Sequence, residues 1–336
     1  MKIKVVKNGA NMTEFIFAIN ATMPIVLMVV VGYFLKRIGL VDTTLAKAMN
    51  KLVFRVFLPA MLFLNVYKIE SFADIDFTFV WYTLIATVIL FLVAIPTVMV
   101  MTKENPKRGA LLQSVFRANY ALVGIPLATS LFGEAGGIMA TVLSAFIVPV
   151  FNTLAVIGLS IFSSDKKPSV KKVLLGIAKN PLIQSIALGF VALGIRAIFV
   201  RTGVDFRLSD VTPIYKTLSN LSSVATPLAL IVLGAQFELS AIPELKKYIT
   251  FGIVTRNLVI PFIGLSVAYL IGCFEGAHFA TFVAVFCTPV AVSSVPMAQE
   301  MDADVSLAGQ LVVWSTVFSA ASIFLASFVL KALGVF

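Results

Sequence analysis

Acidic residues, histidine and cysteine are scarce in this 336-residue chain. Only 12% of its residues are charged, and it holds 16 acidic residues, one histidine and two cysteines. The single His278 excludes a multi-histidine metal centre, and Cys273 and Cys287 are too few for a disulfide framework. We therefore expect two free thiols, no metal and no cofactor. An intramembrane enzyme would need Asp, Ser–His or clustered His chemistry at membrane depth, and the chain offers almost none.

Long apolar runs are abundant instead. Hydrophobic residues make up 60% of the chain and its mean hydropathy is +1.02, whereas soluble domains are about half apolar and about a quarter charged. The composition therefore predicts a polytopic protein of the lipid bilayer. The net charge of +10 does not indicate nucleic acid, because the basic residues lie mainly in short loops and form no stripe with interleaved aromatics.

Ten apolar segments are long enough to cross a bilayer, which takes about 20 residues. The predicted fold class is therefore an all-α membrane protein with ten transmembrane helices. The expected spans are 17–36, 45–66, 79–101, 109–132, 138–162, 181–200, 214–237, 248–272, 278–299 and 304–331. A lysine-rich linker at 163–180 separates residues 1–162 from residues 181–336, with five spans in each half. Because five is an odd number, homologous halves would lie inverted in the membrane.

The two halves resemble each other weakly in three features that recur in the same order. These are a proline, a glycine and an aromatic residue at equal spacing, then a proline inside the second span, then an interrupted fourth span. The residues are Pro24, Gly32 and Tyr33 against Pro181, Gly189 and Phe190, and Pro59 against Pro227. Such a pattern indicates inverted repeats. We also expect Gly32, Gly189 and Gly194 to be positions of close helix packing.

Lysine and arginine gather in alternate loops. One set of loops contains Lys36, Arg37, Lys47, Lys51, Lys103, Lys107, Arg108, the lysines of 163–180, Lys246 and Lys247, while acidic residues gather in the opposite set. Because cytoplasmic loops are enriched in basic residues, the first set is expected to face the cytoplasm. We therefore expect a protein of the cytoplasmic membrane with both termini outside, although three lysines near the N-terminus argue mildly against this orientation.

Two of the expected spans are interrupted. Residues 117–133 contain Asn119, Gly124 and Pro126 in an apolar run, and residues 287–299 contain Pro289 and Pro296. Proline donates no backbone hydrogen bond, and a broken span survives only where it faces protein or a water-filled cavity. Broken spans in matching positions of two halves point to a transporter's binding site. The candidate substrate-binding residues are Arg117, Asn119, Tyr120, Gly124, Pro126, Thr288, Pro289, Ser293 and Ser294. The alternative is a pair of proline kinks whose Ser and Thr hydroxyls bond to local carbonyls.

No acidic residue is expected at mid-membrane, where proton pumps and many sodium-coupled carriers place one. Four basic residues lie in or beside the spans instead: Arg55, Arg117, Lys216 and Arg256. Either these side chains reach out to an interface, or the ligand supplies the negative charge that they lack.

With these motifs the chain resembles the auxin efflux carrier family, which includes bacterial malate-permease-like proteins and plant PIN-type auxin carriers. The matching residues are Tyr33 to Leu40, Leu58-Pro59-Ala60, Arg117 to Tyr120 with Gly124 and Pro126, Thr288-Pro289, and Ala298 to Asp302. The resemblance implies two inverted repeats with crossed fourth and ninth helices. It also implies a scaffold of spans 1, 2, 6 and 7, and transport of small organic anions. Unlike plant members, this chain has Arg-Ala-Asn in place of Asn-Pro-Asn at the first crossing, and it lacks a long cytoplasmic loop.

The expected function is therefore a secondary transporter for a small organic anion such as malate, working by alternating access. Two alternatives stay open: a membrane receptor or sensor that binds a ligand without moving it, and an exporter of auxin-like amphipathic acids. Carriers with this kind of scaffold are often homodimers. The sequence leaves the substrate, the direction of transport and the coupling ion undetermined.

Overall fold

The computed structural model describes residues 23–24, 26–68, 77–162, 175, 178–204, 206–237 and 239–335. These residues are mostly helical and contain no strand, which confirms the all-α prediction. Six of the described helices are long and apolar enough to cross a membrane, so the count of ten spans stays a prediction. Residues 1–22 and most of the predicted linker 163–180 lie outside the described residues.

The helices follow the expected spans closely. After a helix at 26–37, the first half contains α2 (Thr43–Leu52), η1 (Val53–Phe57), α3 (Leu58–Tyr67), α4 (Phe77–Met101), α5 (Asn105–Phe116), η2 (Tyr120–Gly124) and α6 (Ile125–Phe162). The second half contains α8 (Pro181–Arg201), η3 (Leu208–Asp210), α9 (Thr212–Gln236), η4 (Leu239–Ala241), α10 (Ile242–Val254), η5 (Thr255–Val259), α11 (Ile260–Ile271), α12 (Ala277–Phe286), α13 (Ser294–Glu300) and α14 (Val305–Ala332). Helix α6 kinks at Phe132 and Gly133, just where two spans were expected to join.

Three short π-helical segments each end two residues before a proline. Segments η1, η2 and η5 precede Pro59, Pro126 and Pro261. A proline ring clashes with the carbonyl four residues earlier and leaves that carbonyl without its usual donor. In all three cases this carbonyl belongs to the π segment, whose wider turn accommodates the ring. The prolines therefore reshape these helices without ending them.

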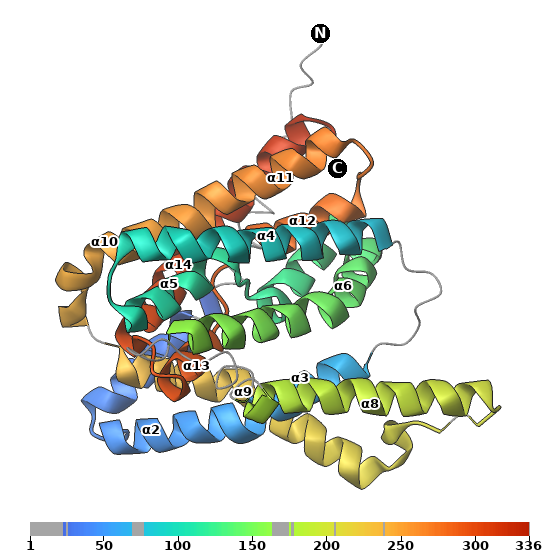
Figure 1. The fold of residues 1–336 in the computed structure, drawn as a ribbon, viewed down its shortest axis with the longest axis horizontal. Helices are drawn as coiled ribbons and strands as arrows, with labels where there is room; N and C mark the ends of the chain where they lie inside the picture. Colours follow the sequence, from blue (N-terminus) through green and yellow to red (C-terminus); the bar gives the residue numbers. More distant parts are fainter. Residues whose placement is uncertain are drawn as a thin grey trace.

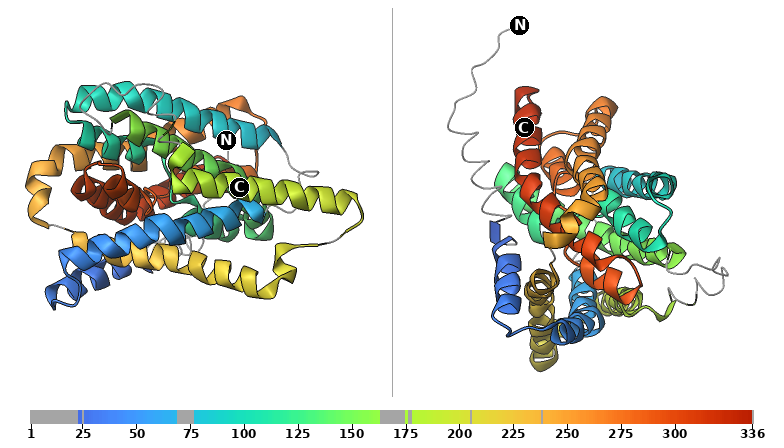
Figure 2. Two further views of the ribbon diagram at one scale, coloured as in Figure 1. Left: turned by 60° about the horizontal axis from the view of Figure 1, so that its bottom comes forward. Right: turned by 90° about the vertical axis from the view of Figure 1, so that its left-hand side faces the viewer.

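The helices form two groups. Helices α2, α3, α8 and α9 lie together along the lower side of Figure 1, and the right-hand view of Figure 2 shows them below the larger bundle of α4–α6 and α10–α14. Glycine allows close approach inside the smaller group: a Cβ added at Gly32 would lie 2.1 Å from the Ile231 carbonyl oxygen, and one at Gly189 would lie 2.9 Å from Val66 Cβ. These two packing predictions are confirmed. The prediction for Gly194 fails among the described residues, because a Cβ there would meet none of them within 4 Å.

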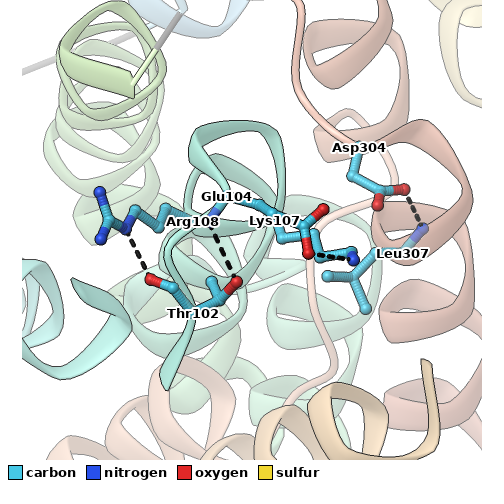
Figure 3. Close-up of polar contacts among 6 residues, drawn as sticks. All are labelled: Thr102, Glu104, Lys107, Arg108, Asp304 and Leu307. Carbon is cyan, nitrogen blue, oxygen red and sulfur yellow. Dashed lines mark hydrogen bonds and ion pairs between the residues drawn. The ribbon is translucent and has the colours of Figure 1, made fainter. Parts of the chain in front are cut away.

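The two broken segments run antiparallel. At one end, the start of α5 lies beside the loop before α14, where the Asp304 amide donates to the Pro106 carbonyl over 3.0 Å. Figure 3 shows this end: the Asp304 carboxylate caps α14 by accepting from the Leu307 amide, and Arg108 Nε donates to the Thr102 carbonyl. At the other end, a Cβ at Gly276, just before α12, would lie 2.8 Å from the Phe132 ring. The middles of the two segments are thereby brought together.

Candidate functional site

The two helix breaks meet directly. Helix α5 ends at Phe116 and is followed by extended backbone at Arg117, whereas α12 ends at Phe286 and is followed by Cys287 in a helical conformation before the chain leaves the helix. Ala118 and Val290 form an antiparallel bridge, and the Asn119 amide donates to the Pro289 carbonyl over 2.8 Å. Backbone groups that lose their helical partners at the breaks thus pair with each other, as a buried position requires.

A cavity of about 230 Å³ lies beside this crossing. The two breaks and α6 form one side of it, and α3 and α9 of the smaller helix group form the other. Its lining comprises Leu58, Met61, Arg117, Ala118, Asn119, Tyr120, Ala121, Val148, Phe151, Asn152, Ala225, Thr226, Ala229, Ala291, Val292 and Ser293. The cavity therefore lies where the two helix groups meet.

Arg117 supplies a fully buried positive charge to this cavity, with only 1% of its surface exposed. Its guanidinium donates to Gln113 Oε1 over 2.7 Å, Asn152 Oδ1 over 2.6 Å and Ser293 Oγ over 2.7 Å. All three acceptors are neutral. Among the described residues, the ion pairs join Arg55 to Glu300 and Lys107 to Glu104, and none reaches Arg117. The charge is thus held in place by hydrogen bonds without being neutralised.

Asn119 adds an unused donor. The residue is 5% exposed, and in the described part of the chain its Nδ2 atom has no hydrogen-bond partner. A buried amide without a partner is costly and uncommon in folded proteins. Because Asn119 lines the cavity next to Arg117, a bound acceptor such as a carboxylate would satisfy it.

The structure separates the predicted site residues into two sets. Arg117, Asn119, Tyr120 and Ser293 line the cavity. The other predicted residues do not line the cavity. Ser294 Oγ lies 3.4 Å from Arg117 Nη1, and the Pro289 carbonyl accepts from the Asn119 backbone amide. Pro126 lies in the first turn of α6, Gly124 allows α12 to approach, and the Thr288 hydroxyl donates to the Ala284 carbonyl. The local bonding of Thr288 is what the proline-kink alternative expects.

Sequence reasoning missed three polar partners of the cavity. Asn152 and Gln113 hold the Arg117 guanidinium, and Thr226 of α9 joins the lining. Asn152 lies in the middle of an apolar run, which by itself marks an intramembrane polar position. Gln113 lies one helical turn before Arg117, and that spacing places the two side chains on one helix face.

The four embedded basic residues also fall into two pairs. Arg117 and Arg256 are each 1% exposed, so neither reaches out to an interface. Arg55 and Lys216 are exposed, as side chains that extend to an interface would be. The thiols of Cys273 and Cys287 are free, as expected.

Comparisons with known proteins agree with these features. The family described as membrane transport protein matches residues 17–171 and again residues 159–327, which correspond to the two predicted halves. An uncharacterized transporter of Methanothermobacter thermautotrophicus is 22% identical over 332 residues, covering 94% of this chain and 99% of the relative. An uncharacterized transporter of Methanocaldococcus jannaschii is 26% identical over 309 residues, covering 89% of this chain and 94% of the relative. The chain therefore belongs to this family of membrane transport proteins, the auxin efflux carriers, and is a multi-pass membrane transporter and not an enzyme.

Proposed function

We propose that the protein is a secondary transporter for a small organic anion, namely a dicarboxylate such as malate. The observation that carries this proposal is that, among the described residues, the buried Arg117 has no carboxylate partner and the side-chain Nδ2 atom of Asn119 in the same cavity has no hydrogen-bond partner. A buried charge is normally paired, and here the ligand would provide the missing negative charge. Ser293 would complete the polar wall, whereas Tyr120 lines the cavity with its hydroxyl already donating to the Ala140 carbonyl over 3.0 Å.

The cavity size favours a small anion over an auxin-like amphipathic acid. Pockets for drug-sized ligands usually have volumes of roughly 300–1,000 Å³, and this cavity measures about 230 Å³. The described residues place the charged and amide groups on one side only, which suits a compact ligand with its carboxylates close together.

Alternating access would come from relative motion of the two helix groups. Leu58 and Met61 of α3 and Ala225, Thr226 and Ala229 of α9 face the crossing across the cavity. Moving the larger bundle along this apolar wall would open the cavity first to one side of the membrane and then to the other. This proposal includes ten spans in inverted repeats (1–162 and 181–336), insertion in the cytoplasmic membrane with both termini outside, and assembly as a homodimer.

The test is uptake of radiolabelled malate into proteoliposomes, with and without an imposed pH gradient or membrane potential. Asn119→Ala should reduce saturable uptake at least about tenfold, because a lost hydrogen bond to a charged ligand costs about 1.5–3 kcal/mol. It should leave the melting temperature nearly unchanged, because Nδ2 has no partner to lose. Asn220→Ala, at an exposed position of α9, is the matched control and should transport normally.

The other outcomes separate the alternatives. Normal uptake by a well-folded Asn119→Ala variant would overturn the site assignment. Thermal stabilisation by malate without uptake would favour a receptor. Stabilisation by a larger carboxylate alone would favour the amphipathic-acid exporter. The response of uptake to each gradient would identify the coupling.

A further inference from the structure

Arg256 is a second buried cation, but it lies outside the cavity lining. It belongs to the π segment η5, is 1% exposed, and donates from Nε to the Thr288 carbonyl over 2.8 Å and from Nη2 to the Val285 carbonyl over 2.7 Å. Both carbonyls lie at the C-terminal end of α12, where the helix breaks. Its hydrogen bonds therefore go to the backbone of the second broken span.

The end of α12 is an electronegative position. The last four carbonyls of a helix lack intrahelical donors, and this end carries a partial negative charge. In transporters with broken helices, unwound carbonyls and the C-terminal ends of half-helices are the groups that coordinate a coupling cation. In this chain the guanidinium of Arg256 already bonds to two carbonyls of that kind.

We propose that Arg256 is a built-in cation that takes the place of a bound metal ion at the end of α12. An arginine side chain stays protonated under all physiological conditions, so the position is permanently filled. The crossing then folds without any added cation. Removing the guanidinium would expose the Val285 and Thr288 carbonyls and create a site for a small monovalent cation. This inference concerns the ion requirement of the fold, and it stands whatever the transported substrate is.

Arg108 provides a matched control. Its Nε donates to the Thr102 carbonyl over 2.8 Å (Figure 3). Its Nη2 lies 3.4 Å from the Met99 carbonyl, at the C-terminal end of α4. The contacts resemble those of Arg256, but Arg108 is only partly buried. Water can therefore solvate these carbonyls when the arginine is removed, and no cation site should form.

The experiment measures thermal unfolding of the purified protein, without substrate, for the wild type, Arg256→Ala and Arg108→Ala. Each protein is measured in three buffers of equal ionic strength: choline chloride alone, choline chloride with guanidinium chloride at low millimolar concentration, and sodium chloride. We expect Arg256→Ala to melt well below the wild type and to regain on the order of 5 °C with guanidinium, the rise growing with concentration as for a bound ligand. The wild type and Arg108→Ala should not respond. An Arg256→Ala protein that responds to neither cation would overturn the proposal.

A second pair of variants covers the case in which Arg256→Ala fails to fold. Arg256→Lys keeps the charge and donors, whereas Arg256→Met keeps only the apolar stem. The proposal expects the lysine variant to fold and to ignore added cations, and the methionine variant to be recovered in much lower yield. Equal yields of the two would show that the position needs volume and not charge. Because no substrate is added, these results are independent of any failure of malate uptake.

Discussion

The two helix breaks pair with each other through their backbones but differ in side-chain chemistry. At the first break, Arg117 and Asn119 line a cavity, and the Nδ2 atom of Asn119 has no partner among the described residues. At the second break, Arg256 bonds the Val285 and Thr288 carbonyls, and the Val290 amide donates to Ser315 Oγ over 3.0 Å. The first break is thus open to a ligand through its side chains. At the second, the two carbonyls and the Val290 amide are satisfied by the protein's own groups.

This difference supports the proposal that two helix breaks, one in each region matched by the family model, form a single binding site. Both breaks supply the crossing with extended backbone, which two interrupted helices require in order to pair. Only the first adds a charge and a donor that the fold leaves available. The second contributes Ser293, which reaches across to Arg117 over 2.7 Å. The second break therefore supports the first one, and substitutions at the two should have different consequences.

The largest effect is expected at the first break, for Arg117→Met. This change removes the charge from the cavity and leaves Gln113 Oε1 and Asn152 Oδ1 without their donor. Each buried acceptor left unsatisfied costs about 1–3 kcal/mol, so for the two acceptors we expect a total loss of roughly 2–6 kcal/mol of stability together with loss of anion uptake. Thermal unfolding and proteoliposome uptake measure the two effects separately.

Arg55→Met is the control for Arg117→Met. The Arg55 side chain is 59% exposed and lies 3.8 Å from Glu300, so its removal should change stability by less than about 1 kcal/mol. If Arg117→Met transports the anion like the wild type, the Arg117 charge plays no part in transport. The difference between the two breaks would then be structural only.

The next effect is expected at the second break, for Ser315→Ala. Ser315 Oγ accepts from the buried Val290 amide and lies 3.2 Å from the Val312 carbonyl. Without it the amide has no other partner in the described structure, so we expect a loss of about 1–3 kcal/mol of stability. The apparent affinity for the anion should stay within a factor of about two, because Ser315 does not line the cavity.

Ser319→Ala gives the matched comparison for Ser315→Ala. Ser319 is also fully buried on α14, but its hydroxyl donates only to the local Thr316 carbonyl. Ser319→Ala should therefore lower the free energy of unfolding by less than Ser315→Ala does. If the two variants melt alike, the bond from Ser315 to the crossing contributes nothing to its stability.

Much of this asymmetry could not be predicted from the sequence, although the helices could. Apolar runs and prolines place the helices and both breaks, because hydropathy and the missing proline N–H are local properties. The partners of a buried side chain are not local. Arg117 bonds to Asn152, 35 residues away, and Arg256 to Thr288, 32 residues away. The sequence shows these residues but not which of them meet.

Thr288 is an instructive case of the same limit. In sequence it is equivalent to the other hydroxyl residues of the second break, and we predicted that it would bind the ligand. In the structure its hydroxyl donates to the Ala284 carbonyl, one turn earlier on α12, and it is absent from the cavity lining. Ser293 has the same functional group but follows Pro289 and projects toward Arg117. The side-chain direction on either side of the break decides the role.

The smallest effect is therefore expected for Thr288→Val, which keeps the shape of the side chain and removes only the hydroxyl. The lost bond is local, so stability should fall by no more than about 1 kcal/mol and uptake should stay within a factor of about two. Ser293→Ala is the comparison, and it should reduce uptake several-fold because it removes a contact to Arg117 at the cavity wall. If Thr288→Val loses uptake as severely as Ser293→Ala, the Thr288 hydroxyl must also contact the anion during the transport cycle. The difference between the two breaks would then hold for this conformation alone.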